Sequence, residues 1–245
     1  MVITGGSRGI GAATARLAAQ GGYDVCVNYL VNAEAAERVC AEVRAAGRKA
    51  LAVQADVANE DDLVRLFEAT DRELGRVTVL VNNAAVVGKG RRRVEASSAA
   101  AVNALLATNV TGPFVCAREA IRRMSTRHGG LGGAIVNVSS AASRLGAPDL
   151  WVDYAASKGA IDTFTIGLAQ EVAEEGIRVN AVRPGLIDTE IHQLTGIPDR
   201  VARSAKLIPM KRAGTAEEVA KAILWVASPA ASYVTGAIID VAGGR

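Results

Sequence analysis

Residues that bind metals or form disulfides are scarce in this chain. It has two histidines, His128 and His192, and neither lies in an HExxH pattern. Its three cysteines form no CxxC pair and fall in apolar or helical surroundings: Cys26, Cys40 and Cys116. In such surroundings a buried free thiol is the usual outcome. We therefore expect no metal site and no disulfide framework.

Long apolar runs and a strong charge bias are also missing. No stretch approaches the roughly 20 apolar residues that span a bilayer, and the chain begins on an apolar strand rather than on a signal-peptide pattern. The net charge is only +3, and the one basic run is Arg91-Arg92-Arg93. Nucleic-acid binding usually needs a broader basic face. We expect a cytoplasmic protein with neither a membrane nor a nucleic-acid partner.

Aromatic residues make up only 4% of the 245 residues, yet hydrophobic residues reach 50%, much of it alanine and valine. Short runs rich in valine and isoleucine alternate with longer stretches of helical periodicity. The predicted strands are Met1–Thr4, Asp24–Tyr29, Lys49–Ala55, Val77–Asn82, Gly133–Ser139, Ile177–Arg183 and Gly236–Val241. The predicted helices lie near residues 10–21, 32–46, 60–74, 98–127, 153–175 and 215–228.

This alternation of strands and helices predicts right-handed crossovers and a parallel sheet covered on both faces. Runs such as "VTVLV" (77–81) and "AIVNV" (134–138) are almost wholly apolar, as expected of strands buried on both faces. The chain has no Pro/Ser-rich linker, low-complexity tract or convincing internal repeat. We therefore predict a single α/β domain over residues 1–245, a doubly wound seven-stranded parallel sheet with helices on both faces.

The first predicted strand runs directly into a glycine-rich turn, "TGGSRGIG", that opens a helix. Gly5, Gly9 and Gly11 have the spacing G-x-x-x-G-x-G, wider than the common G-x-G-x-x-G pattern. Without Cβ atoms, such a turn lets a pyrophosphate approach the backbone and rest on the helix N-terminus. Because it lies between a strand and an amphipathic helix, this turn favours dinucleotide binding over a mere tight connection.

The end of the second predicted strand bears on which dinucleotide is bound. NAD-binding domains usually carry an acidic residue there that bonds the ribose 2′-hydroxyl. Here the strand ends on Asn28 and Tyr29, and the first acidic residue is Glu34. Arg8, within the glycine-rich turn, is placed to attract a 2′-phosphate, although it could equally be a solvated surface charge. The pattern favours NADP over NAD.

A third pattern, "YAASK" at 154–158, places a phenol and an ammonium four residues apart. On a helix, Tyr154 and Lys158 would project from the same face. A cation beside a phenol favours the phenolate and lowers the phenol's pKa. The spacing is therefore suited to a proton donor and acceptor, with an ordinary surface pair as the alternative.

Six motifs occur in order along almost the whole chain: "TGGSRGIG" (4–11), "NNAA" (82–85), Asn109, "NVSS" (137–140), "YAASK" (154–158) and "RPG" (183–185). Together they resemble the short-chain dehydrogenase/reductase family, and within it the 3-oxoacyl-(acyl-carrier-protein) reductase-like and glucose dehydrogenase-like members. The resemblance implies a Rossmann-type domain that transfers a hydride between a nicotinamide and a ketone or secondary alcohol. The alternative is a catalytically silent nucleotide-binding sensor or regulatory protein.

The resemblance also implies catalytic roles. Tyr154 would be the general acid/base, and Lys158 would lower its pKa and bond the nicotinamide ribose. Ser140 would bind the substrate oxygen, although the stretch from Ser140 to Tyr154 looks about one residue longer than in the acyl-carrier-protein reductases, which leaves Ser139 or Ser143 as competitors. Asn109 would hold a water that links Lys158 to solvent; otherwise its amide merely bonds neighbouring backbone.

For the cofactor, the resemblance implies an extended set of contacts. The residues expected to bind NADP are Gly5, Ser7, Arg8, Gly9, Ile10, Gly11, Asn28, Tyr29, Asp56, Val57, Asn82, Ala84, Tyr154, Lys158, Pro184, Gly185, Ile187 and Thr189. Residues 186–212 would form a substrate lid over a small or medium carbonyl compound. An acyl thioester is one candidate, and Arg91–Arg93 would then meet its acidic carrier. The helices near 98–127 and 153–175 would form the interface of a homotetramer. Ala242 stands where the family leads us to expect an aspartate.

Overall fold

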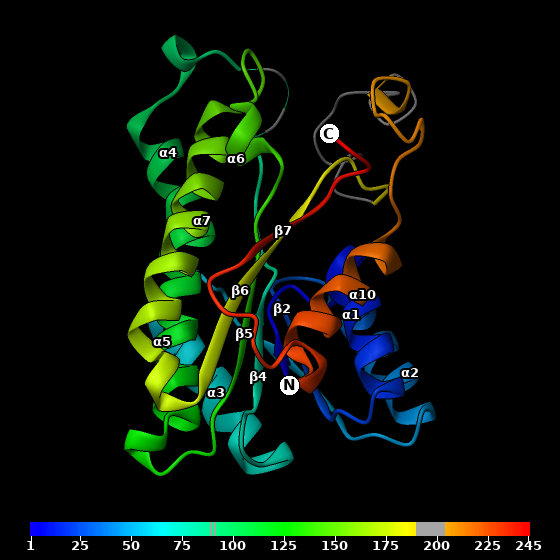
Figure 1. The fold of residues 1–245 in the computed structure, drawn as a ribbon, viewed down its shortest axis with the longest axis vertical. Coiled ribbons are helices and arrows are strands. Elements are labelled where there is room, and N and C mark those ends of the chain that lie inside the picture. The colour runs from blue at the N-terminus through cyan, green and yellow to red at the C-terminus, as the bar shows by residue number, and fades with distance from the viewer. Residues whose placement is uncertain (89, 91, 190–203) are drawn as a thin grey trace.

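A seven-stranded parallel sheet forms the centre of the computed structural model, which describes residues 1–88, 90, 92–189 and 204–245 (Figure 1). The strands are β1 (Val2–Ile3), β2 (Val25–Tyr29), β3 (Ala50–Gln54), β4 (Val79–Asn82), β5 (Gly133–Val138), β6 (Ile177–Pro184) and β7 (Ile238–Val241). Their order is β3-β2-β1-β4-β5-β6-β7, so the direction of winding reverses between β1 and β4. The predicted fold class is confirmed.

Helices cover both faces of the sheet. They are α1 (Gly9–Gln20), α2 (Ala33–Ala45), α3 (Glu60–Leu74), α4 (Ala99–Leu106), α5 (Gly112–Met124), α6 (Ala142–Leu145), α7 (Val152–Val172) and α10 (Ala216–Ala227). Short turns of other types are η1 (Val94–Ala96), the π-turn η2 (Ala107–Thr111), η3 (Thr126–His128), η4 (Ala173–Glu175) and η5 (Pro229–Ala231). In Figure 1, α1, α2 and α10 lie on one side of the sheet, and α4, α5 and α7 lie on the other.

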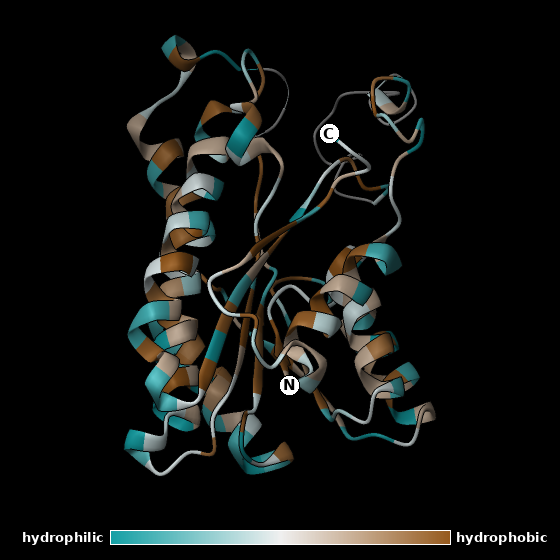
Figure 2. Ribbon diagram, viewed as in Figure 1, coloured by the Kyte–Doolittle hydropathy of each residue, from teal (hydrophilic) through white to brown (hydrophobic). Residues whose placement is uncertain are grey.

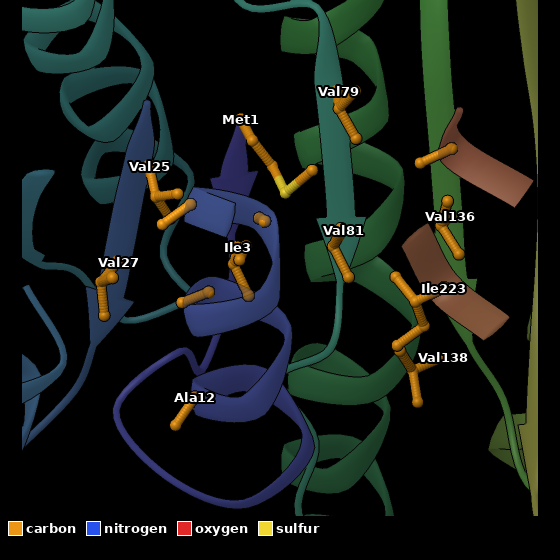
Figure 3. Packing of buried hydrophobic residues seen from close by; sticks show 14 of the residues in the cluster. Met1, Ile3, Ala12, Val25, Val27, Val79, Val81, Val136, Val138 and Ile223 are labelled. Atoms are coloured by element: carbon orange, nitrogen blue, oxygen red, sulfur yellow. The ribbon is translucent and has the colours of Figure 1, made fainter. Parts of the chain in front are cut away.

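The core divides into two layers because successive side chains of a strand point to opposite faces. Val25 and Val27 of β2 pack toward α1 and α2, whereas Cys26 between them packs toward α3. Figure 3 shows the first layer, where strand valines lie beside Ala12 of α1 and Ile223 of α10. Hydrophobic colour accordingly runs along the strands in Figure 2, while hydrophilic segments lie on the outer faces of the helices.

The helix predicted over 98–127 is divided into α4, η2 and α5. Single π-turns within helices are frequent at functional sites. The run Ala99–Met124, 26 residues, also passes a length-and-hydropathy test for a membrane span, which the sequence analysis did not expect. That test is weak because core helices pass it too, and here α5 packs on β4 and β5.

Candidate active site

Most of the predicted site residues line one cavity of about 850 Å³ at the carboxyl ends of the strands. On its wall lie Gly5, Ser7, Arg8, Gly9, Ile10, Asn28, Tyr29, Asp56, Val57, Ala84, Ser140, Tyr154, Lys158, Pro184, Gly185, Ile187 and Thr189. The cavity spans the β1–β4 reversal, where doubly wound sheets bind their ligands. Three predicted residues lie behind the wall rather than on it: Gly11, Asn82 and Asn109.

The glycine-rich turn is held tightly against the turn that follows β4. A Cβ on Gly5, whose φ is +61°, would lie 3.0 Å from the Cα of Ala84. A Cβ on Gly11 would lie 2.5 Å from the carbonyl oxygen of Gly5, so Gly11 permits close packing rather than ligand contact. Asn83, which belongs to the "NNAA" motif but was assigned no role from the sequence, donates from Nδ2 to the carbonyl oxygens of Thr4 and Gly5 at 2.9 and 3.0 Å.

The N-terminus of α1 differs from those of the other long helices on its side of the sheet. The Asn32 side chain caps α2 by accepting the backbone N–H of Ala35, and the Thr215 side chain caps α10 by accepting that of Glu218. At α1 the N-cap residue is Arg8, and within the described part of the chain its side chain makes no capping hydrogen bond. The first N–H groups of a helix carry partial positive charge and attract anions. With the glycine turn before it, this end of α1 fits a pyrophosphate.

Guanidinium groups surround the part of the cavity next to the end of β2. Arg8, Arg16 and Arg38 all line it. Arg16 is paired with Glu42, and Arg38 donates to Glu34 at 2.6 Å, whereas Arg8 is exposed and has no ion pair within the described part of the chain. Arg16 and Arg38 were missed because their positions on α1 and α2 become neighbours of Arg8 only once the helices pack.

The side-chain amide of Asn28 bonds to the backbone on both sides of β2. Its Oδ1 accepts from the backbone N–H of Gly5 at 3.1 Å, and its Nδ2 donates to the carbonyl oxygen of Ala55 at 2.9 Å. Asp56 is likewise engaged, since its Oδ1 accepts from the N–H of Ala58 at 2.9 Å. Both residues therefore hold the shape of the wall on which they lie.

Tyr154 and Lys158 lie on one face of α7, as the spacing predicted. Lys158 Nζ is 5.7 Å from the centroid of the Tyr154 ring and donates to the carbonyl oxygen of Val138 at 2.7 Å. Lys158 is only 3% exposed. Burial lowers the pKa of its ammonium from 10.5 to about 8, and the carboxylate of Asp162 opposes part of that change. A cation thus stands beside the phenol in a largely dry place.

The three candidate serines have different surroundings. Ser139 Oγ donates to Asp162 at 2.6 Å and is buried. Ser143 Oγ is buried without a hydrogen-bond partner in the part of the chain that the structure describes, and it is not on the cavity wall. Ser140 lies on the wall and accepts from the N–H of Ala142 at 3.1 Å, at the start of the short helix α6. Ser139 also lines the wall, but its hydroxyl is already donated to Asp162, so Ser140 is the better placed of the two for contact with a substrate.

Asn109 and Asn82 are buried beneath the cavity. The side chain of Asn109, in the π-turn, accepts from the N–H of Val86 at 2.8 Å and donates to its carbonyl oxygen at 2.9 Å. It also donates to Ser157 Oγ at 3.1 Å. Asn82 Nδ2 donates to Asn137 Oδ1 at 2.9 Å, which links β4 to β5. These contacts give both amides a part in holding the backbone under the site.

The segment after β6 closes the far end of the cavity. The N–H of Gly185 donates to the carbonyl oxygen of Val241 at 3.0 Å, and a Cβ on Gly185 would lie 2.8 Å from the Cα of Ala242. Ala242 is 8% exposed, so a small residue fits this close packing. Of the expected lid, residues 190–203 lie outside the described residues.

The two described arginines of the basic run are paired with acidic neighbours. Arg92 forms an ion pair with Asp153, and Arg93 contacts Glu95 at 2.6 Å and Asp149 at 3.1 Å. Arg91 lies outside the described residues. Arg92 is thus largely buried in its ion pair, whereas the Arg93 side chain remains 68% exposed.

Comparison with known proteins agrees with this geometry. The family model described as Enoyl-(Acyl carrier protein) reductase matches residues 5–245. The chain belongs to the short-chain dehydrogenase/reductase family. The uncharacterized oxidoreductase YgfF of Escherichia coli strain K12 is 56% identical to it over 244 residues, covering 100% of this chain and 98% of the relative.

Two further relatives extend the comparison. A 3-oxoacyl-(acyl-carrier-protein) reductase of Synechocystis is 38% identical, covering 99% of this chain and 95% of the relative. The crystal structure of a short chain dehydrogenase from Burkholderia cenocepacia in complex with NADP has a TM-score of 0.90 and 32% identity, covering 99% of this chain and 96% of that one. This short-chain dehydrogenase/reductase is therefore an oxidoreductase.

Proposed function

We propose that this short-chain dehydrogenase/reductase uses NADP(H) to interconvert a ketone and a secondary alcohol, with Tyr154 as the general acid/base. The observation that carries the proposal is the juxtaposition of Tyr154 with the buried Lys158 on the wall of a cavity that also contains the glycine-rich turn. Ser7, Arg8 and Gly9 at the uncapped N-terminus of α1 would hold the pyrophosphate, and Pro184, Gly185 and Ile187 would lie along the nicotinamide.

When bound, the nicotinamide supplies or accepts a hydride at the substrate carbon. In reduction, the Tyr154 hydroxyl donates its proton to the carbonyl oxygen, which becomes the alcohol, and the resulting phenolate is reprotonated from solvent. In oxidation, the phenolate takes the alcohol proton. An ordinary tyrosine has a pKa near ~10 and would be a poor base at neutral pH. The ammonium of Lys158 stabilises the phenolate and so lowers the free energy of this proton transfer.

Ser140 serves the other side of the reacting oxygen. Its hydroxyl is on the wall with Tyr154, and in the described residues its oxygen is seen to accept only the N–H of Ala142. The hydroxyl hydrogen can therefore be donated to a substrate oxygen. Donors aimed at a developing negative charge stabilise the transition state. Ser140 and Tyr154 together would fix the substrate oxygen in place.

The preference for NADP(H) rests on charge at the adenosine end of the cavity. The end of β2 offers Asn28 and Tyr29 but no carboxylate, and the nearby Glu34 and Glu42 are each engaged by an arginine. Arg8 is exposed on the same wall. A 2′-phosphate would meet attraction there, whereas a 2′-hydroxyl would lack the acidic partner usual in NAD sites.

Replacing Arg8 by alanine tests this preference. We expect the variant to bind NADPH roughly 10- to 150-fold more weakly, since a hydrogen bond to a charged group contributes about 1.5–3 kcal/mol, and to bind NADH almost as the wild type does. Titration of cofactor fluorescence measures both constants. Arg65→Ala, which removes an exposed guanidinium on α3, is the control. Equal losses for the two cofactors would refute the phosphate contact.

The function itself is tested by mixing the protein with NADPH and a panel of ketones, 3-oxoacyl thioesters and sugars while following loss of the reduced nicotinamide. We expect turnover with at least one ketone class and transfer of the hydride to the carbonyl carbon. Tight NADPH binding without turnover across the panel, in either direction, would favour the silent sensor instead.

We further propose that α5 and α7 form the subunit contact of a homotetramer. Phe114 of α5 and Phe164 of α7 stack with ring centroids 3.8 Å apart, and Phe114 remains 48% exposed. Ile166, also on α7, is 43% exposed. The stacked Phe114–Phe164 pair and Ile166 thus leave apolar surface on these two helices, which a subunit contact would cover. A monomeric mass by light scattering at micromolar concentration would contradict the proposal.

A further inference from the structure

An acidic residue, Asp162, lies one helical turn beyond Lys158 and takes no part in the mechanism described above. Asp162 follows Lys158 by four positions on α7, so the two side chains share a face. The Asp162 side chain is 13% exposed. Taking a carboxylate out of water is costly unless it is paired and hydrogen-bonded, so its contacts should be informative.

Both oxygens of Asp162 are occupied, each by a different strand. Oδ1 accepts from Ser139 Oγ, at the end of β5, at 2.6 Å. Oδ2 accepts from Arg183 Nη1, near the end of β6, at 3.2 Å. Ser139 lies on the cavity wall itself and precedes Ser140, and Arg183 directly precedes the wall residue Pro184. One carboxylate thus ties α7 to both strands directly behind the reacting groups.

Asp162 also supplies a negative charge that acts on Lys158. On α7 the polar groups about Lys158 are the Tyr154 phenol and the Asp162 carboxylate. From β5 it meets the uncharged Val138 and Ser139. β6 contributes the cation Arg183, which is itself held by Asp162 and by Asp240. Within the described residues, Asp162 is therefore the anion that favours the ammonium form of Lys158.

We propose that Asp162 is a positioning residue of the reaction: its carboxylate holds the ends of β5 and β6 against α7 and keeps Lys158 in its ammonium form. The inference rests on the proposed function, because the Lys158 ammonium matters to the reaction only by stabilising the Tyr154 phenolate. It assigns to Asp162 a role that acts through Lys158 and Ser139, without contact with the substrate.

Asp240 of β7 offers a matched control for Asp162. It accepts from Arg183 Nε at 2.7 Å and from Nη2 at 3.2 Å, and its side chain is 38% exposed. Asp162 and Asp240 therefore hold the same arginine, but only Asp162 acts on Lys158. A carboxylate that only held Arg183 would leave the Lys158 titration midpoint unchanged when it is replaced at either position.

The experiment compares Asp162→Asn with Asp240→Asn in protein labelled with ¹³C at the lysine ε-carbons. The Lys158 resonance is identified by its loss in Lys158→Arg, and its midpoint is followed with pH. We expect the midpoint to fall by about one pH unit or more in Asp162→Asn, since a nearby opposite charge shifts a pKa by about 1–3 units. It should stay close to the wild-type value in Asp240→Asn. In alcohol oxidation, the loss of kcat/KM at high pH should move downward with it.

A second variant keeps the test decisive if Asp162→Asn folds poorly. Arg183→Gln removes a cation that competes for Asp162, so the Lys158 midpoint should rise. Unchanged midpoints in both variants would overturn the proposal, as would equal shifts in Asp162→Asn and Asp240→Asn. If the midpoints shift as expected but no carbonyl compound is turned over by the wild type, the proposed function fails while the charge relation between Asp162 and Lys158 stands.

Discussion

Tyr154→Phe should lower kcat for carbonyl reduction by about 10²–10⁴-fold, the usual contribution of a positioned general acid or base. The substitution removes one hydroxyl from a half-buried ring and leaves the glycine-rich turn and the α1 N-terminus intact. NADPH affinity and thermal stability should therefore stay near the wild-type values. Stopped-flow measurement of hydride transfer with saturating NADPH separates the chemical step from cofactor binding.

Tyr233→Phe is the control for this variant, because Tyr233 is fully exposed and distant in sequence from every motif. Its rate should equal that of the wild type. If Tyr154→Phe kept a near-normal rate of hydride transfer, the proton would have to come from another group, and the assignment of the acid/base would be wrong. A combined loss of rate and NADPH binding would point to a damaged cofactor site instead.

Lys158→Met should raise the stability of the protein at neutral pH while nearly abolishing turnover. Burial lowers the pKa of the Lys158 ammonium from 10.5 to about 8, a difference of about 3 kcal/mol at 1.36 kcal/mol for each unit. Methionine has a similar length and no charge to desolvate. It also loses the hydrogen bond to Val138, which contributes about 1 kcal/mol. The expected net gain at pH 7 is about 2 kcal/mol.

The pH dependence of this gain has a defined sign. Between about 8 and 10.5, the unfolded wild type keeps the Lys158 proton while the folded protein has lost it. Stability rises with pH wherever the unfolded state binds more protons. Above pH 8, the free energy of unfolding of the wild type should therefore rise toward that of Lys158→Met. Urea unfolding at pH 7 and pH 9.5 measures the difference in unfolding free energy between the two proteins. Lys221→Met, at an exposed lysine, is the control. If Lys158→Met were less stable than the wild type by the same amount at both pH values, burial of the ammonium would not be destabilising, and the prediction would be wrong.

Local patterns were enough to predict the sheet and most of the cavity wall. The apolar runs predicted all seven strands because parallel strands buried on both faces need continuous hydrophobic sequence. The glycine-rich turn follows β1, and "YAASK" lies near the start of α7. Both line one cavity because these parts of the chain lie at the same edge of the sheet. The position of each motif relative to a predicted strand or helix was therefore enough to predict most of the wall residues.

Features that depend on tertiary packing were not predicted. The π-turn at Asn109 accompanies side-chain contacts with Val86, 23 residues away, which no helical pattern reveals. Side-chain alternation distinguishes Asn82, which bonds to β5, from Asn83, which bonds to the glycine-rich turn. Asp162 resembled any polar helix residue until β5 and β6 brought two partners to its carboxylate.

Direct titration of the Tyr154 phenol in the complex with NADP⁺ is the sharpest test of the mechanism. The ultraviolet difference spectrum between wild type and Tyr154→Phe isolates the phenolate of this one side chain as pH is raised. The account predicts a midpoint well below the ~10 of an ordinary tyrosine, and a return toward that value in Lys158→Met. A midpoint at or above the ordinary value in the wild-type complex, unchanged by Lys158→Met, would contradict it.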